Sequence, residues 1–350
     1  MRLQTTTIGA FPKPACVPIS DWFQGPSGPD TVDPTVGYAA QLAAAGAGAE
    51  ALFVRAAQEV IADQVACGVD IPTDGEVRRE NYIHYHCRHL DGIDFETLTE
   101  KELRGGAYAA ALPTVTGKVR ARDRFLAHDW RVAQAFTDRP LKVTMPGPMT
   151  IADTVANAHY DDEAQLGADL AAAINEELLA LADAGCRYIQ IDEPVFARRP
   201  EQALAWGFEN LERCFHGAPD SVVRTVHMCC GYPDRLDNPD YPKADRDAYL
   251  RLADAIEDSS VQAVSLEDAH RHNDLRLLER FRSTTVILGA VAVAKSRIEP
   301  VDEIRARLRA ALDHIDLGRL IAAPDCGLGL LGRELAVAKL TNLCAAAHDV

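Results

Sequence analysis

The residues best suited to chemistry are a histidine and a cysteine two positions apart, His227 and Cys229. They end the apolar, β-branched run 222–226, so we expect them at the end of a β-strand. Residues two apart on a strand share a face, so His227 and Cys229 would point one way and Cys230 the other. An imidazole and a thiolate side by side supply half of a zinc site. A plain buried core is the alternative, because free cysteine is among the most buried residue types.

The elements that would position these side chains are short β-rich runs alternating with helical patterns. The predicted strands are residues 5–8, 69–72, 141–145, 188–191, 222–228, 261–266, 285–291 and 320–323. The clearest helix is 162–184, with an apolar stripe at steps of three and four, Asp162 as a suitable N-cap and Gly185 as a C-cap. Similar patterns at 300–315 and 332–347 predict two more helices.

Eight strands alternating with helices predict an α/β fold with a parallel sheet, and closure into a (β/α)8 TIM barrel is the simplest arrangement. A doubly wound open sheet is the alternative, but no Gly-x-Gly-x-x-Gly follows the first strand. We predict one domain, residues 1–350, with two long βα connections at 78–125 and 231–247. The first contains a polar tract and the second, with three prolines and no helical period, is predicted to be a structured loop.

Bulk composition limits the partners. The 350 residues include 36 Lys and Arg against 52 Asp and Glu, a net charge of −16 without any basic block, so nucleic acid is not an expected partner. The first eleven residues lack the apolar core of a signal peptide, and the longest apolar run, 286–294, is too short to span a bilayer. Nine cysteines without framework spacing indicate reduced thiols. We therefore expect a cytoplasmic protein without a membrane partner.

Acidic and sulfur-containing residues gather at the predicted strand ends, which meet at one face of a barrel. These ends read Asp74-Gly75-Glu76, Asp192-Glu193-Pro194, His227-Met228-Cys229, Glu267-Asp268 and Pro324-Asp325-Cys326-Gly327. His227, Cys229, Cys326 and one carboxylate would make a tetrahedral site, and two thiolates favour zinc over magnesium or calcium. The alternatives are a solvated strand-end acid for Glu267 and a core thiol for Cys326.

In this order, and together with residues 5–12 and 147–150, these motifs resemble the cobalamin-independent methionine synthase family, specifically its catalytic C-terminal barrel. The resemblance spans nearly the full length. It implies a (β/α)8 barrel and a zinc ion (Zn2+) held by His227, Cys229, Glu267 and Cys326. It also implies that homocysteine binds near Ile8, Ala10, Glu76 and Asp192.

The implied reaction is zinc-dependent methyl transfer to homocysteine, giving methionine. A free thiol has a pKa of about 8.5, and coordination to zinc deprotonates it. Glu76 and Asp192 are suited to an α-ammonium, although a structural role in a turn is the alternative for Asp192. No catalytic residue beyond the zinc site is indicated.

The departures from the family concern the methyl donor. Where folate-using synthases have a stacking tryptophan, this chain has Thr154, and residues 291–296 lack their catalytic histidine. Ala10 replaces a serine of the first motif. A tertiary amine leaves poorly without a proton donor, so we expect a donor other than free methyl-folate, such as a methyl-carrier or corrinoid protein.

Three alternatives remain open. One is a folate-dependent methionine synthase proper. The second is an alkyltransferase acting on another thiol such as coenzyme M, as in the epoxyalkane transferases, for which a basic residue would be expected in place of Glu76 and Asp192. The third is a non-catalytic barrel stabilised by zinc. His84 and His86 would share a face if extended, and the loop 232–241 is a candidate lid; packed loop residues are the simpler interpretation of both.

Overall fold

The main sheet has seven parallel strands in the order β1-β10-β9-β8-β7-β6-β4. The computed structural model describes residues 2–24, 32–103, 108–232, 234–238 and 241–350. The strands are β1 (Gln4–Thr5), β4 (Lys142–Pro146), β6 (Tyr188–Asp192), β7 (Val223–Met228), β8 (Ala263–Leu266), β9 (Thr285–Val291) and β10 (Leu320–Pro324). Each coincides with or overlaps a predicted strand.

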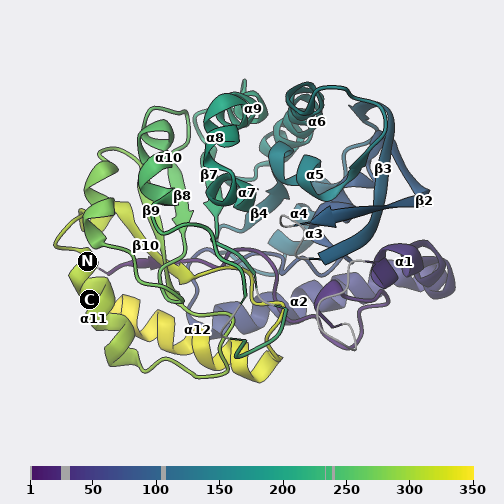
Figure 1. Ribbon diagram of the computed structural model, residues 1–350. Helices are drawn as coiled ribbons and strands as arrows, with labels where there is room; N and C mark the ends of the chain where they lie inside the picture. The colour runs from purple at the N-terminus through teal and green to yellow at the C-terminus, as the bar shows by residue number, and fades with distance from the viewer. Residues whose placement is uncertain (1, 25–31, 104–107, 233, 239–240) are drawn as a thin grey trace.

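The remaining predicted strand, 69–72, lies between the two edges of this sheet. Ile71 bridges Thr6 and Thr73 bridges Lys142, both in parallel. The Lys142 amide also donates to the Pro72 carbonyl at 2.9 Å. These contacts bring the edges at β1 and β4 toward each other, so the sheet is curled (Figure 1). The predicted α/β class and the TIM-barrel-like curvature are confirmed.

Helices pack on the outer surface of the curled sheet (Figure 1). The longer ones are α1 (Val32–Ala45), α2 (Ala49–Cys67), α4 (Leu126–Gln134), α6 (Glu163–Ala184), α9 (Phe208–Phe215), α10 (Ala248–Glu257), α11 (Val301–Ala311) and α12 (Arg333–His348). Asp162 caps α6 by accepting from the Ala164 amide, and Gly185 ends it at φ 104°. Both predicted caps are therefore confirmed, because a left-handed C-cap favours glycine.

The two faces of β4 and β6 differ in polarity. On β6, Ile189 and Ile191 belong to the main hydrophobic cluster that includes the packed helices. The alternate residue Gln190 is fully buried on the inner face, as is Thr144 of β4. This alternation follows from the two-residue period of a strand. The polar inner faces of β4 and β6 lead toward the strand ends that carry the predicted site.

The connection 78–125 contains structure that the sequence analysis missed. A short helix, α3 (Tyr82–Cys87), precedes a long antiparallel hairpin of β2 (Leu90–Leu103) and β3 (Tyr108–Ala121). The strand β5 (Ala156–Asn157) pairs with β3. The polar tract is therefore a β-hairpin that projects beside α5 (Pro148–Thr154) and α6 (Figure 1).

The histidines of this connection also differ from the extended arrangement considered above. Asn81 caps α3 by accepting from the Ile83 and His84 amides, at 2.8 and 3.1 Å. Two residues on a helix are about 200° apart, so His84 and His86 do not share a face. Both are buried, and burial lowers the pKa of His84 to about 4 and that of His86 to about 3. They are packed, neutral residues rather than a second metal pair.

The other long connection, 231–247, forms no helix or strand in its described residues, as predicted. The short helices α7 (Pro194–Arg198) and α8 (Pro200–Gln202) follow β6. None of the helices in the described part of the chain is long and apolar enough to cross a lipid bilayer.

Candidate active site

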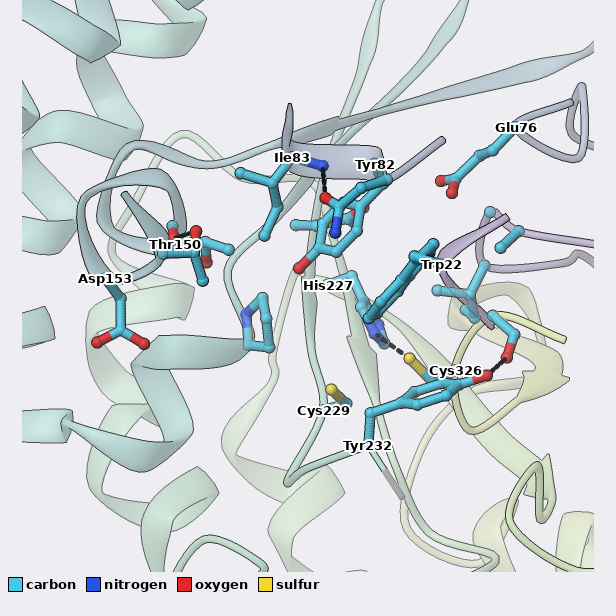
Figure 2. A pocket seen from close by; sticks show the side chains of 18 of the residues that line it. Trp22, Glu76, Tyr82, Ile83, Thr150, Asp153, His227, Cys229, Tyr232 and Cys326 are labelled. Atoms are coloured by element: carbon cyan, nitrogen blue, oxygen red, sulfur yellow. Dashed lines mark hydrogen bonds between the residues drawn. The ribbon is translucent and has the colours of Figure 1, made fainter. Parts of the chain in front are cut away.

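A pocket with about 1060 Å³ of empty space opens where the strands of the curled sheet end (Figure 2). Its wall includes four residues predicted to bind the acceptor and three predicted to bind a metal. These are Ile8, Ala10, Glu76, Asp192, His227, Cys229 and Cys326. Residues that follow β1 and β10 therefore line the same cavity as residues at the ends of β6 and β7, although the most distant of them lie more than 300 positions apart in the sequence. The structure brings together all but one of the predicted site residues.

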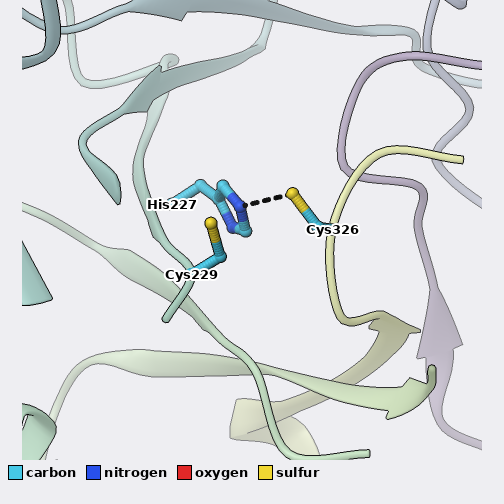
Figure 3. A group of neighbouring side chains, drawn as sticks. All are labelled: His227, Cys229 and Cys326. Atoms are coloured by element: carbon cyan, nitrogen blue, oxygen red, sulfur yellow. Dashed lines mark hydrogen bonds between the residues drawn. The ribbon is translucent and has the colours of Figure 1, made fainter. Parts of the chain in front are cut away.

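Three predicted metal ligands form a compact group at one end of this pocket (Figure 3). The ligand atoms of His227, Cys229 and Cys326 all lie within 4.8 Å of one another. The Cys326 sulfur is 3.5 Å from Nε2 of His227. Cys230 faces the hydrophobic cluster instead and does not line the pocket, so the predicted opposition of the two adjacent cysteines is seen in the structure.

The neighbours of this group orient its side chains. Ser265 on β8 lies opposite His227 on β7, and its hydroxyl is 2.9 Å from Nδ1. When Nδ1–H donates to Ser265, Nε2 is left as the acceptor that faces the thiols. On the other side, Asp325 accepts from the amides of Asp268, Ala269 and His270 at 2.7–2.9 Å. That buried carboxylate anchors the backbone immediately before Cys326.

The two thiols form a coupled pair. A hydrogen bond from Cys326 lowers the pKa of Cys229 well below its usual value; burial opposes this effect and His227 adds to it. The same contact raises the pKa of Cys326, and burial raises it further. The surroundings therefore favour the thiolate form of Cys229, the form that binds metals.

Glu267, the fourth predicted ligand, does not join this group in the structure. Its carboxylate accepts from the Cys230 amide at 3.0 Å and pairs with Lys243 and with His270. Although burial opposes ionisation, His270 and Lys243 lower the pKa of Glu267 to about 2. Glu267, His270 and Asp325 form a second group whose ligand atoms lie within 4.8 Å. The carboxylate would have to leave Lys243 to complete a four-ligand site with the thiols.

Glu76 lies in a strained turn on the pocket wall. Gly75 and Glu76 both have positive φ, 66° and 57°, a conformation that costs free energy in a residue with a side chain. The Asp74 carboxylate stabilises the turn by accepting from the Glu76 amide at 3.0 Å. The Glu76 carboxylate accepts from Thr144 at 2.8 Å, and Arg79 lies 3.4 Å away. Strain of this kind is typical of binding sites.

Asp192, at the end of β6, is the second acid of the wall. Burial raises its pKa to about 7, and the negative charge of Glu76 contributes to the increase. Gln190 donates to its Oδ1 at 2.7 Å. The following residue, Glu193, turns away from the pocket and accepts from the Met149 and Thr150 amides at 2.9 Å. A bound cation would therefore meet two acids, Glu76 and Asp192, at this end of the pocket.

Aromatic rings line the pocket beside the sulfur group (Figure 2). Trp22 lies 6.0 Å from Tyr82 and 6.3 Å from Tyr232 between ring centroids. Thr154 also lines the pocket, so the position occupied by tryptophan in folate-using synthases faces the cavity here as threonine. The pocket therefore has aromatic rings, but they come from segments other than the one that carries Thr154.

The second histidine of the pocket wall, His84, is not a proton donor near neutral pH. Its Nδ1 lies 2.7 Å from the Thr35 hydroxyl, and the side chain is buried. Burial and the nearby Arg88 charge lower the pKa of His84 to about 4. His84 therefore does not replace the acid that residues 291–296 lack.

Comparison with known proteins identifies the family of the chain. Residues 38–349 match the family model described as the catalytic domain of cobalamin-independent synthase. The chain belongs to this family. Membership confirms the resemblance seen in the motifs and indicates a methyltransferase.

Individual relatives are similar in sequence to most of this chain. A methionine synthase of Sulfolobus acidocaldarius is 28% identical over 97% of this chain and 90% of its own length. A methionine synthase of Saccharolobus solfataricus is 30% identical over 81% of this chain and 80% of its own length. The solved structure of a B12-independent methionine synthase from Shewanella sp. W3-18-1, in complex with selenomethionine, has a TM-score of 0.85 and 29% identity, covering 99% of this chain and 97% of its own.

Sequence reasoning missed the residues that support the site. Ser265, Asp325 and Gln190 act through neighbours on other strands or loops. Trp22 and Tyr82 enter the pocket from segments without a strand-end signal. Only the pairing of strands, which aligns Ser265 with His227, could have identified the first of these residues.

Proposed function

We propose that the chain is a zinc-dependent methyltransferase that methylates homocysteine to methionine. The observation that carries this proposal is the group of His227, Cys229 and Cys326 at one end of a pocket whose wall also holds Glu76 and Asp192. On this proposal, His227, Cys229 and Cys326 would activate the thiol, and Glu76 and Asp192 would bind the ammonium in the same cavity. A non-catalytic barrel stabilised by zinc would not need the acidic pair Glu76 and Asp192 on the pocket wall.

The donor set fits zinc. One imidazole and two thiolates are borderline and soft ligands, which suit zinc better than magnesium or calcium. Glu267 would be the fourth ligand after its carboxylate leaves Lys243. A bound zinc ion would hold the acceptor thiol as a thiolate at neutral pH.

The pocket wall supports an amino-acid acceptor. Glu76 and Asp192 supply anionic partners for an α-ammonium, whereas a sulfonate thiol such as coenzyme M would be repelled by them. The pocket-lining cation Arg198 is paired with Asp153 at 3.5 Å. The Shewanella relative was solved with selenomethionine, the selenium analogue of the proposed product.

The acceptor sulfur would attack the methyl carbon as the bond from that carbon to the donor breaks, with its electron pair leaving on the donor. We propose a donor other than free methyl-folate, because the pocket offers His84 only as a buried, neutral ring that is hydrogen-bonded to Thr35. Trp22 and Tyr82 could stack on a flat donor, so the missing histidine, rather than Thr154, disfavours methyl-folate. The name of the Shewanella relative, B12-independent, lends no support to a corrinoid carrier.

Two structural proposals accompany this function. The segment 69–73, which contacts both sheet edges, would complete a (β/α)8 barrel as its remaining strand. Residues 1–350 would then form a single catalytic domain.

The proposed function is tested by incubating the zinc-loaded protein with homocysteine and each of a panel of methyl donors, and measuring methionine by mass spectrometry. We expect methionine with at least one donor and little or none with methyl-folate. Robust turnover with methyl-folate would show that the missing histidine does not exclude this donor. Selective methylation of coenzyme M in a parallel arm, with homocysteine left unchanged, would contradict the assigned acceptor.

A further inference from the structure

A lysine is buried beneath the acidic wall of the pocket. Lys142 on β4 is 2% exposed. Within the described part of the chain its ammonium makes one hydrogen bond, to Gln190 Oε1 at 2.6 Å, and no ion pair. Burying an ammonium without a carboxylate partner is unfavourable, which is why burial lowers the pKa of Lys142 to about 7. A feature this costly to stability calls for a role that an apolar residue could not fill.

The position of Lys142 fixes the orientation of the Gln190 amide. A glutamine side chain has one acceptor oxygen and two N–H donors, and it can rotate to exchange them. Here Nε2 donates to the Ile8 carbonyl and to Asp192 Oδ1, both at 2.7 Å. The Ile8 carbonyl cannot donate in return, nor can the Asp192 carboxylate when it is ionised, and the amine of Lys142 donates to Oε1 whether or not it is protonated. Rotating the amide would place Oε1 of Gln190 against two hydrogen-bond acceptors, the Ile8 carbonyl and Asp192 Oδ1.

This hydrogen-bond network ends at the part of the pocket wall that is proposed to bind the methyl acceptor, homocysteine. Ile8 and Asp192 both line the pocket. Because Gln190 occupies Oδ1, the Asp192 carboxylate is held in one rotamer, and its Oδ2 has no hydrogen-bond partner among the described residues. Thr144, two residues beyond Lys142 on β4, holds Glu76 in a comparable way. The inner faces of β4 and β6 thus support both acids of the wall.

We propose that Lys142 and Gln190 are positioning residues that orient Asp192 to bind the α-ammonium of an amino-acid thiol, a role that rests on the proposed homocysteine methyltransferase function. Lys142 acts only through Gln190. The two residues set selectivity for a thiol that carries an amino group, and do not contribute to metal binding.

The test compares two ligands that differ only in the amino group, homocysteine and its desamino analogue γ-sulfanylbutyrate. Dissociation constants are measured by calorimetry on the zinc-loaded protein. We expect Lys142→Met to weaken homocysteine binding about tenfold, as for the loss of one oriented hydrogen bond to a charged group, while the analogue changes less than twofold. Zinc content should be unchanged. An unaltered ratio between the two ligands in a folded, zinc-loaded variant would overturn the proposal.

A second variant guards against misfolding. Lys142→Met/Gln190→Met replaces both members by apolar side chains of similar volume, which is often nearly neutral for stability, and should lose the same selectivity. The matched control is Lys339→Met/Glu299→Gln, which removes a buried lysine whose ammonium pairs with Glu299 at 2.8 Å away from the pocket. The control should keep the wild-type ratio, and an equal loss of selectivity there would contradict a specific role for Lys142.

A crystal structure of the wild-type protein with homocysteine gives an answer that needs no variant. The ammonium should contact Asp192 Oδ2 while Gln190 still donates to Oδ1, and an ammonium bound elsewhere overturns the proposal. Failure of the proposed function is distinguishable, because the wild type would then bind neither thiol. If only the positioning role is wrong, the wild type and the variants will prefer homocysteine over the desamino analogue to the same extent.

Discussion

Cys229→Ser is expected to remove the metal from the protein and to lower methionine formation by roughly a thousandfold, about 4 kcal/mol of transition-state stabilisation. Its sulfur lies within 4.8 Å of the ligand atoms of His227 and Cys326. A serine hydroxyl is a much harder and less readily ionised ligand than a thiolate, so it would not replace the sulfur on zinc.

The matched control is the neighbouring residue. Cys230→Ser changes the same atom type one position along the chain, but that side chain faces the hydrophobic cluster. We expect it to keep stoichiometric zinc and most of the activity, with a modest loss of stability from burying a hydroxyl. Zinc is measured by plasma mass spectrometry after gel filtration. Equal zinc loss in both variants would show that the assignment of the two cysteines to opposite faces is wrong.

Asp192→Asn is the second large effect. The substitution keeps the shape of the side chain but removes its negative charge, so one of the two acids proposed to bind the ammonium, Glu76, remains. We expect the dissociation constant for homocysteine to rise about 30- to 100-fold, as for the loss of a charge-assisted hydrogen bond, while zinc content stays at the wild-type level.

A control separates this effect from a general loss of charge. Asp169→Asn removes a carboxylate that accepts from the Tyr160 hydroxyl at 2.7 Å and does not line the pocket. It should bind homocysteine as the wild type does. If Asp192→Asn also retains wild-type affinity, the acid has the structural turn role considered as the alternative.

Much of this fold follows from local patterns in the sequence. Runs such as 285–291 are continuously apolar and β-branched, as expected for strands buried on both faces, and the structure places β9 at the same residues. The helix α6 was predictable from its apolar stripe and its two caps. The order of elements and the strand ends could therefore be predicted from the sequence. The same is true of His227, Cys229 and Cys326, which lie at those ends.

The hairpin of β2 and β3 could not be predicted from local sequence patterns. Its strand 90–103 carries Asp, Glu, Thr and Lys with no clean alternation, because much of it is solvent-exposed. The supporting residues were missed for a different reason. Gln190 and Lys142 have no distinctive local signal, and their role depends on strands that meet only in the folded sheet. The position of Glu267 beside Lys243, a loop residue 24 positions earlier in the sequence, likewise depends on tertiary structure.

The central claim is that this site activates a thiol on zinc, and zinc-edge X-ray absorption with and without homocysteine tests it most directly. The free protein should show two sulfur ligands, from Cys229 and Cys326, together with nitrogen and oxygen from His227 and Glu267. Saturating homocysteine should add a third sulfur, whereas its S-methylated product should not bind as tightly. A zinc shell that still contains two sulfurs in saturating homocysteine would contradict the account.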